Sequence, residues 1–256
     1  MKKAVRPQQD SETPLQGFAS LCGTVIVALF ALTFVFQNFA IPSASMASTL
    51  LIGDHVLVDR ATLGPSASWA HFMPYRAIRR GEPIVFYKPV LEPDGQEIIL
   101  VKRVIGVPGD RIHLRRGIVY LNGVAQQEAR AAKPTFANYD PYRDDFPAIP
   151  PSGVPRVTAQ WALDLPNHIR GEDLVVPEGS YFVLGDNRTN SLDGRYWGFV
   201  PRSNLIGRPL FVYWSFETPA DQIDKTSLAE ETSVTLHQIT HFFQDTRWRR
   251  TFHPIR

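Results

Sequence analysis

A long apolar run near the N-terminus is the feature that most constrains the fold of this chain. From Phe18 to Phe36 there are nineteen residues without a formal charge, rich in Val, Leu, Ala and Phe. A membrane-spanning helix needs about 20 apolar residues, whereas the apolar part of a secretory signal peptide has only about 7–15. The run therefore predicts a single N-terminal transmembrane helix over residues 18–36.

The charges on either side of this run predict its orientation. Lys2, Lys3 and Arg6 precede it, while Gln37 to Val56 contains no Lys or Arg. The positive-inside rule then places the N-terminus in the cytoplasm and the rest of the chain outside the membrane. An alternative is a cleaved signal peptide, because Ser45-Met46-Ala47 has the small-x-small spacing of a cleavage site.

Beyond residue 50 the sequence pattern indicates β structure. Short runs rich in Val, Ile and aromatic residues alternate with turn signals such as Pro108-Gly109-Asp110 and Asn122-Gly123. The 21 prolines also favour extended, loop-rich structure over a helical bundle. The expected strands are His55–Asp59, Pro83–Lys88, Ile98–Val107, Arg111–Leu121, Ser180–Leu184 and Gly207–Ser215. We therefore expect a mainly β fold, in which the transmembrane helix is followed by an antiparallel β-rich domain.

Residues 124–179 differ from the rest, since they hold eight of the prolines and few β-branched runs. This favours an inserted, cap-like subdomain that is ordered by packing on the main sheet more than by a core of its own. The expected organisation is residues 1–17 in the cytoplasm, 18–36 in the membrane, 37–123 and 180–216 in the β-rich domain, 124–179 in the Pro-rich insertion, and 217–256 in a C-terminal tail.

The tail combines arginines with aromatic side chains, which allows two interpretations. It could contact anionic lipid at a membrane surface, or it could be a solvated terminal helix. The residues concerned are Arg247, Arg249, Arg250, Arg256, Phe242, Phe243, Trp248 and Phe252.

Composition excludes several other classes of function. The net charge of +2 gives no reason to expect nucleic acid as a partner. Cys22 is the single cysteine, so no internal disulfide is possible, and no cysteine or histidine cluster has metal-ligand spacing. We expect neither a metal nor a cofactor, and the sequence does not indicate an oligomeric state.

Three segments carry residues suited to nucleophilic chemistry. They are PSASMASTL from Pro42 to Leu50, KRVIGVPGD from Lys102 to Asp110, and GDNRTNSLDGRYWGFVP from Gly185 to Pro201. A serine hydroxyl is a weak nucleophile and needs a base, yet no histidine near these segments has a convincing companion pattern. Lys102 lies in an apolar run where desolvation could keep its amine neutral, although a strand-edge lysine with its charge in water is the common alternative.

Together, in this order and behind an apolar run, the three segments resemble the type I signal peptidases, the membrane-bound serine endopeptidases that release secreted proteins from their signal peptides. The resemblance extends from the apolar run to Trp214 and is weak across the insertion and the tail. It implies that Ser45 is the nucleophile, that Lys102 is the general base, and that the reaction proceeds through an acyl-enzyme. It also implies that the Ser43 hydroxyl and the Ser45 backbone N–H bind the oxyanion.

The third segment supplies the residues that the resemblance implies as support for this pair. Ser191 matches a serine that hydrogen-bonds the catalytic lysine. Asp186, Arg188, Asp193 and Arg195 match polar residues that brace the site. For Asp193 and Arg195, an alternative is a surface ion pair of little energetic weight.

Two positions depart from the family pattern, since Ser48 stands where proline is frequent and Thr189 where aspartate is frequent. Neither is a nucleophile or a base, so the departures bear on loop rigidity after Ser45 and on the charge near the site.

The resemblance also implies the partners and the location. Its substrates are signal peptides with small side chains at the first and third positions before the cut, which small pockets would select. We expect a single-pass protein of the bacterial cytoplasmic (inner) membrane, with its N-terminus inside and its catalytic domain outside. Candidate pocket residues near the motifs are Ile41, Pro42, Ala44, Leu100 and Ile105. A candidate apolar lip that rests in the lipid consists of Met46, Leu50, Leu51, Ile52, Phe72 and Met73, and the alternative is ordinary core packing for half of them.

Three other hypotheses stay open at this point. The chain could be another Ser-Lys peptidase of similar fold, such as a self-cleaving repressor, although those carry a DNA-binding N-terminal module. It could be a catalytically silent, membrane-anchored binding module. It could also be a secreted protein that is cut after Ala47 and thereby loses Ser45.

Overall fold

The structure, a computed structural model, describes residues 13–63, 76–92, 94–217, 237–238 and 240–255. The basic residues expected to orient the apolar run (Lys2, Lys3 and Arg6), most of the expected cytoplasmic segment, and two residues of the expected apolar lip (Phe72 and Met73) lie outside the described residues.

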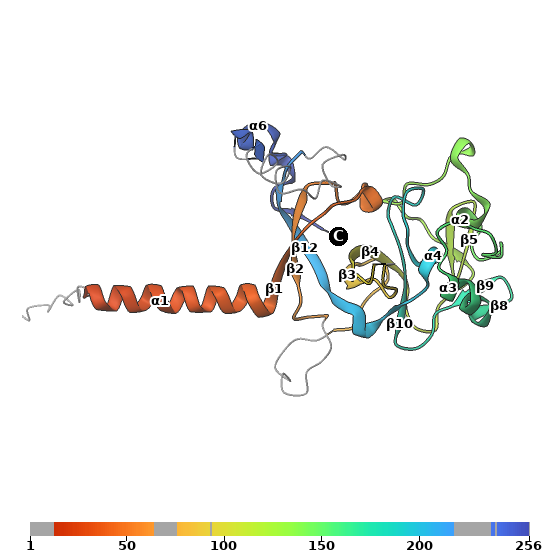
Figure 1. The fold of residues 1–256 in the computed structure, drawn as a ribbon, viewed down its shortest axis with the longest axis horizontal. Coiled ribbons are helices and arrows are strands. Elements are labelled where there is room, and N and C mark those ends of the chain that lie inside the picture. The colour runs from red at the N-terminus through yellow and green to blue at the C-terminus, as the bar shows by residue number, and fades with distance from the viewer. Residues whose placement is uncertain (1–12, 64–75, 93, 218–236, 239, 256) are drawn as a thin grey trace, which may run out of the picture.

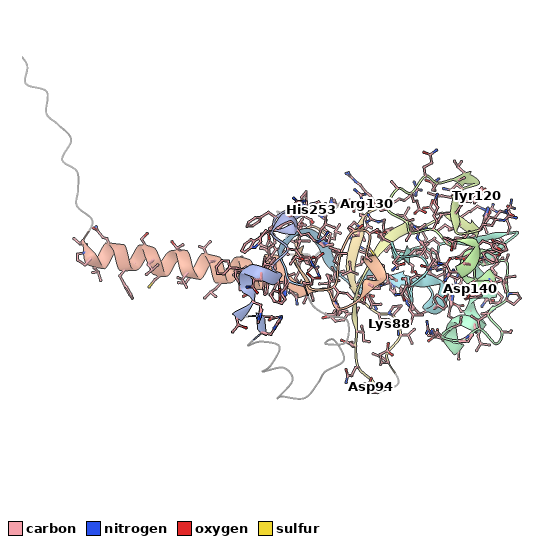
Figure 2. The ribbon with its side chains drawn as sticks, turned by 90° about the horizontal axis from the view of Figure 1, so that it is seen from above. Lys88, Asp94, Tyr120, Arg130, Asp140 and His253 are labelled. Atoms are coloured by element: carbon pink, nitrogen blue, oxygen red, sulfur yellow. The ribbon has the colours of Figure 1, made fainter. Side chains whose placement is uncertain are left out.

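The apolar run is helical, but its helix ends before the predicted boundary. α1 (Pro14–Phe30) is followed by a π-helical stretch, η1 (Ala31–Val35), and the chain then enters strand β1 (Phe36–Ala40) directly. The predicted C-terminal boundary at Phe36 is therefore wrong, because that residue already pairs with Asp59 of the neighbouring strand. Across the described ranges, no single helix combines the length and the apolarity required to cross a membrane. Figures 1 and 2 both show α1 projecting away from the β-rich part of the molecule.

The main sheet of the described residues is antiparallel and follows the order β1-β2-β12-β3-β4-β10-β11, with β13 pairing to β12 beside this path. Strand β12 links the two parts of the sheet, because Leu205 and Gly207 pair with β3 and residues 208–215 pair with β2. Shifts of register occur within both pairings. The strands not yet given are β2 (Asp54–Asp59), β3 (Pro83–Tyr87), β4 (Ile99–Gly106), β10 (Ser180–Leu184), β11 (Val200–Pro201), β12 (Leu205–Ser215) and β13 (His253–Pro254).

A second antiparallel sheet, in the order β7-β6-β5-β9-β8, lies at the end of the molecule away from α1 (Figure 1). Its strands are β5 (Arg111–Arg115), β6 (Ile118–Leu121), β7 (Val124–Ala125), β8 (Ile169–Arg170) and β9 (Asp173–Val175). The expected run from Arg111 to Leu121 is thus a hairpin, with positive φ at Arg116 (49°) and Gly117 (74°) in its turn. This sheet therefore pairs strands that precede residue 124 with strands from the expected insertion, which begins at that residue.

The insertion shares its core with the main sheet. Tyr142, Phe146 and Trp161 pack in one buried cluster with Ile105 of β4 and Phe182 of β10. The rings of Phe146 and Phe182 stack with their centroids 5.7 Å apart. The short helices of this region are η3 (Phe136–Asn138), α2 (Pro141–Asp144), α3 (Ala159–Asp164) and η4 (Leu165–His168). Those of the main domain are η2 (Ala44–Met46), α4 (Gly194–Trp197) and η5 (Arg202–Asn204).

The described part of the C-terminal tail returns to the main sheet. It contains α6 (Phe242–Asp245) and η7 (Trp248–Arg250), and β13 then pairs with β12. An isolated bridge joins Phe216 to Thr246. The interpretation of this segment as a solvated terminal helix is therefore wrong, because ladder and bridge pairing fix its backbone against the sheet.

Candidate active site

The segment that carries Ser45 is a tight turn that follows strand β1. Ser43 has an extended backbone (φ −131°, ψ 155°) and immediately precedes η2. The hydroxyl oxygens of Ser43 and Ser45 are 3.2 Å apart, so the two side chains lie on the same side of the turn. A hydroxyl group is thereby placed next to the oxygen that the sequence predicts to be the nucleophile.

Strand β4 brings Lys102 to this turn. The strand pairs with β3, where Lys102 lies opposite Ile84, and with β10 on its other edge. Lys102 is only 2% exposed, and its Nζ lies 2.7 Å from Ser45 Oγ. The same Nζ lies 3.1 Å from the Val101 carbonyl oxygen. The alternative of a strand-edge lysine with its charge in water is therefore wrong.

Burial changes the proton affinity of Lys102. Removing an ammonium group from water disfavours its charged form, and this lowers the pKa of Lys102 from 10.5 to about 8, although Asp193 and Asp186 act in the opposite direction. With such a pKa, roughly one tenth of the amines are neutral at pH 7. A neutral amine at 2.7 Å from a hydroxyl oxygen is placed to accept its proton.

Ser191 lies beside the pair, but the predicted hydrogen bond to Lys102 is not present among the described contacts. The side chain is buried next to Asp193, and its Oγ makes no hydrogen bond of ordinary geometry with a described residue. A Cβ added at Gly185 would lie 2.2 Å from Ser191 Oγ and 2.6 Å from the Ser45 carbonyl oxygen. Ser191 and the backbone of the Ser45 turn therefore meet across a position that only glycine fits.

Asp186 and Arg103 form a buried ion pair next to Lys102. Arg103 donates from Nε to Asp186 Oδ1 (2.7 Å) and from Nη2 to Oδ2 (2.6 Å). The Thr49 hydroxyl donates to the same carboxylate at 2.5 Å. Asp186, predicted to brace the site, thus connects β4 to the turn that follows Ser45.

Arg188 connects the site to the insertion. Its guanidinium group donates to both carboxylate oxygens of Glu128, at 2.7 and 2.5 Å, and its Nε donates to the Gly185 carbonyl oxygen at 3.1 Å. Arg188 is only 1% exposed, so the pair is held in an environment with little water.

Asp193 and Arg195 form a fully buried ion pair, with both side chains 0% exposed. Two hydrogen bonds of 2.8 Å join them, and Asp193 Oδ2 also accepts from the Gly185 N–H at 3.0 Å. Burial alone would raise the pKa of Asp193, but the charge and hydrogen bonds of Arg195 and its other partners outweigh it and lower the pKa. The alternative of a weak surface pair is therefore wrong.

Sequence reasoning missed Asn187 as a residue of the site. Its backbone N–H donates to the Ser45 carbonyl oxygen at 3.0 Å, and its Nδ2 donates to the Ala44 carbonyl oxygen at 3.1 Å. These two bonds hold the backbone of the serine turn against the loop after β10. Its place inside the quoted segment, between Asp186 and Arg188, was the available signal.

Both departures from the family pattern make hydrogen bonds. The Ser48 hydroxyl donates to the Arg130 carbonyl oxygen, which ties the serine turn to the insertion. Thr189 Oγ1 donates to Asn187 Oδ1 at 3.2 Å.

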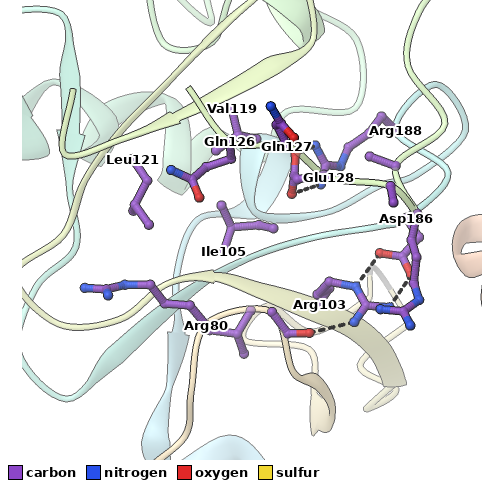
Figure 3. A pocket seen from close by; sticks show the side chains of 15 residues that line it. Arg80, Arg103, Ile105, Val119, Leu121, Gln126, Gln127, Glu128, Asp186 and Arg188 are labelled. Carbon is purple, nitrogen blue, oxygen red and sulfur yellow. Dashed lines mark hydrogen bonds and ion pairs between the residues drawn. The ribbon is translucent and has the colours of Figure 1, made fainter. Parts of the chain in front are cut away.

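The expected apolar lip needs correction. Met46 and Leu50 are 2% and 0% exposed in a core cluster with Ile41, so they do not belong to a lipid-facing lip. A cavity of about 500 Å³ lies beside the Asp186–Arg103 pair, and Figure 3 shows Ile105 on its wall. Of the candidate pocket residues only Ile105 lines this cavity, and neither Ser45 nor Lys102 does.

No metal site competes with this arrangement in the part of the chain that the structure describes, where no group of three or more His, Cys, Asp or Glu side chains could hold a metal ion. The chemistry that the geometry offers is attack by an activated hydroxyl group.

Comparison with known proteins identifies the family. A family model described as signal peptidase, peptidase S26, matches residues 15–214. Signal peptidase I from Leptolyngbya laminosa is 32% identical over 214 residues, which cover 82% of this chain and 84% of that protein. Signal peptidase I from Aquifex aeolicus is 32% identical over 226 residues, which cover 77% of this chain and 82% of that protein.

A crystal structure of a signal peptidase I from Enterococcus faecalis V583 shares 32% sequence identity, covers 52% of this chain and 97% of that chain, and superposes with a TM-score of 0.36. The family model alone spans most of this chain, and the two relatives are each similar over most of their own length. The chain therefore belongs to the signal peptidase family, peptidase S26, and is a peptidase of that family.

Proposed function

We propose that this peptidase removes signal peptides from secreted pre-proteins, with Ser45 as the nucleophile and Lys102 as the general base. One observation carries the assignment of the two residues. A lysine that is 2% exposed holds its Nζ 2.7 Å from a serine Oγ. Burial lowers the pKa of this lysine to about 8, so its amine can act as a base near neutral pH.

Acylation begins when Ser45 Oγ attacks the carbonyl carbon of the scissile peptide bond. Its proton passes to the neutral amine of Lys102 along the 2.7 Å contact. The Ser43 hydroxyl, 3.2 Å from Ser45 Oγ, donates with the Ser45 N–H to the oxyanion that forms. The Lys102 ammonium group then gives its proton to the nitrogen of the mature protein, the C–N bond breaks, and an ester of the signal peptide with Ser45 remains.

Deacylation repeats the proton transfers with water. Neutral Lys102 accepts a proton from a water molecule, whose oxygen attacks the ester carbonyl carbon. Breaking of the ester bond returns the proton to Ser45 Oγ and releases the signal peptide with a free carboxylate.

The surrounding ion pairs keep the two reacting atoms at this distance. Asp186 with Arg103 fixes β4 to the serine turn, and Asp193 with Arg195 fixes the loop that holds Gly185. Buried pairs with several hydrogen bonds are rigid supports, and precise placement of reacting groups contributes strongly to rate. We assign Ser191 to the same support, through its packing against Gly185 and the serine turn.

We further propose that the apolar segment anchors the enzyme in the bacterial cytoplasmic membrane, with its N-terminus inside and the catalytic domain outside. Large apolar side chains of α1 are exposed, among them Leu15 (77%), Phe18 (64%) and Val27 (69%). Water is an unfavourable environment for such a surface, whereas lipid is a favourable one. An N-terminal tag should resist external protease in spheroplasts while the catalytic domain is degraded, and digestion of the tag would contradict this topology.

Cleavage of a synthetic pre-protein by the detergent-purified chain tests the function. The substrate has alanine at the first and third positions before the cut, and its matched control has lysine at the first position. Ser45→Ala should abolish cleavage, whereas Ser203→Ala, which removes an exposed hydroxyl group that bonds Asn204 in η5, should stay within about threefold of wild type. Activity that survives Ser45→Ala would exclude this nucleophile, and a wild type without activity would favour the silent binding module. N-terminal sequencing of the purified chain separates both outcomes from cleavage after Ala47, which would leave a chain that begins at Ser48.

A further inference from the structure

We propose that Arg250, in the C-terminal segment beyond the family match, is a positioning residue that holds the Ser45 turn in its reactive geometry. The inference rests on the proposed role of Ser45 as the nucleophile. The family model ends at residue 214, so the matched part of the chain does not include this arginine.

The nucleophile lies on a loop with a closed base. The Ile41 N–H donates to the Asp54 carbonyl oxygen at 2.8 Å, and the Gly53 N–H donates to the Ile41 carbonyl oxygen at 3.0 Å. Ser45 lies between these two ends, in the first part of the loop. These two bonds fix the ends of the loop. The backbone polar groups of residues 47–52 also need hydrogen-bond partners if the turn at Ser45 is to keep one conformation.

Arg250 supplies such partners from the C-terminal segment. Its Nε lies 3.0 Å and its Nη2 2.5 Å from the two carboxylate oxygens of Asp54, which is 0% exposed. The same Nη2 donates to the Thr49 carbonyl oxygen at 3.0 Å. One guanidinium group therefore holds both the base of the loop and a carbonyl group within it, with the fork geometry that arginine offers and lysine does not.

Thr49 transmits this contact to the serine turn. The Thr49 N–H donates to the Met46 carbonyl oxygen at 2.8 Å, one residue beyond Ser45. Its hydroxyl group donates to Asp186, the partner of Arg103 beside the catalytic lysine. Arg250 thus holds the carbonyl group of Thr49, and Asp186 holds its side chain. The turn with Ser45 lies in the sequence between the N-terminal end of the loop and Thr49.

The C-terminal segment is itself fixed, so it can serve as a support. The Arg247 N–H donates to the Ser215 carbonyl oxygen at 2.8 Å, and Arg247 Nη1 donates to the Ile52 carbonyl oxygen at 3.0 Å. The Ser215 hydroxyl donates to Asp54 Oδ1 at 2.6 Å, so this carboxylate keeps a neutral partner if Arg250 is removed. Arg247 Nη1 is 3.9 Å from the same carboxylate and provides a weaker charge contact.

Arg249 provides a matched control within the same short helix η7. It is exposed, and no ion pair or side-chain hydrogen bond joins it to another described residue. Replacing Arg249 removes the same charge from the same segment without touching the Ser45 loop.

The test measures kcat and KM of the full-length, detergent-purified chain on the synthetic pre-protein, at a temperature well below the Tm of every variant. Arg250→Ala should lower kcat at least tenfold with KM within about twofold, because a displaced nucleophile slows the chemistry more than it weakens binding. Arg249→Ala should leave both values within about twofold. Millimolar guanidinium chloride should recover part of the kcat of Arg250→Ala and leave Arg249→Ala unchanged.

Two further variants separate positioning from the stability of a buried charge. Arg250→Lys keeps a positive charge beside Asp54 but lacks the fork, so its kcat should fall between those of wild type and Arg250→Ala; a wild-type kcat would overturn the proposal. If Arg250→Ala does not fold, this variant alone decides the question. The double variant Asp54→Asn with Arg250→Gln removes both charges, and full recovery of kcat would show that Arg250 only neutralises Asp54. Loss of activity on Ser45→Ala tests the nucleophile independently, so the two proposals fail separately.

Discussion

Replacing Lys102 with methionine should abolish cleavage and yet stabilise the fold at neutral pH. The pKa of Lys102 falls from 10.5 to about 8 on folding, because burial disfavours the ammonium form. Each pKa unit corresponds to about 1.4 kcal/mol, so below pH 8 the buried amine costs the folded state about 3 kcal/mol. Methionine has a similar length and no charge, but it loses the contact with Ser45, which is worth about 1 kcal/mol. The expected net gain is about 2 kcal/mol.

The pH dependence of stability follows from the difference between the pKa values of Lys102 in the folded and the unfolded chain. The unfolded chain binds the proton more tightly than the folded chain does, so wild-type stability rises with pH between about 8 and 10.5. The advantage of Lys102→Met should therefore be full at pH 6–7 and should shrink above pH 8. Urea unfolding of both proteins in detergent, followed by tryptophan fluorescence across this pH range, measures the difference. A variant that is less stable at pH 6, or whose advantage does not change with pH, would refute the reasoning.

The same pKa governs the rate of the wild-type enzyme. Only the neutral amine accepts the Ser45 proton, so kcat/KM should rise with pH through about 8 and then level off. From pH 7 to pH 9 the expected increase is about tenfold. Lys102→Met should have no measurable rate at any pH in this range, and residual activity with the wild-type pH profile would exclude Lys102 as the base.

Three other substitutions test the supports of the site. Gly185→Ala places a Cβ 2.2 Å from Ser191 Oγ, so kcat should fall about a hundredfold or more, and a rate near wild type would contradict the close packing. Asn187→Ala removes its side-chain donor to the serine turn, and kcat should fall about tenfold with an unchanged KM, whereas a change in KM alone would point to substrate binding instead. Arg195→Met leaves the Asp193 charge buried without its partner, and should lower the free energy of unfolding by about 3–5 kcal/mol; a loss below 1 kcal/mol in urea would mean that water reaches the carboxylate.

Much of the β framework was predictable because strand signals are local. The predicted runs at residues 55–59, 83–88 and 98–107 lie within one or two residues of β2, β3 and β4. Strand β1 was not predicted, since Gln37 and Asn38 are polar and form a strand only because β2 supplies a pairing partner. The second sheet was also missed, because β5 precedes the expected insertion, whereas β9 lies near its C-terminal end, and the two strands pair only in three dimensions.

The candidate active site was also predictable only in part. The family resemblance pointed to Ser45 and Lys102, and the structure places Lys102 Nζ 2.7 Å from Ser45 Oγ. Contacts between residues far apart in the sequence could not be predicted, such as the hydrogen bond of Asn187 with Ala44 and the two hydrogen bonds of Arg250 with Asp54. The burial of Asp193 with Arg195 was also not predictable, because two charged residues in a polar loop are usually solvated.

No loop separates η1 from β1, the strand that leads to the turn with Ser45. Every residue from Phe36 to Ala40 is paired with β2, and Ile41 is held at the base of the Ser45 loop, so the path lacks a freely rotating section. In the proposed membrane arrangement the catalytic domain is mounted rigidly, and tilting of α1 moves Ser45 up or down relative to the bilayer. Bilayer thickness, acting through that tilt, then becomes a variable that determines which peptide bond of an embedded substrate the enzyme can reach.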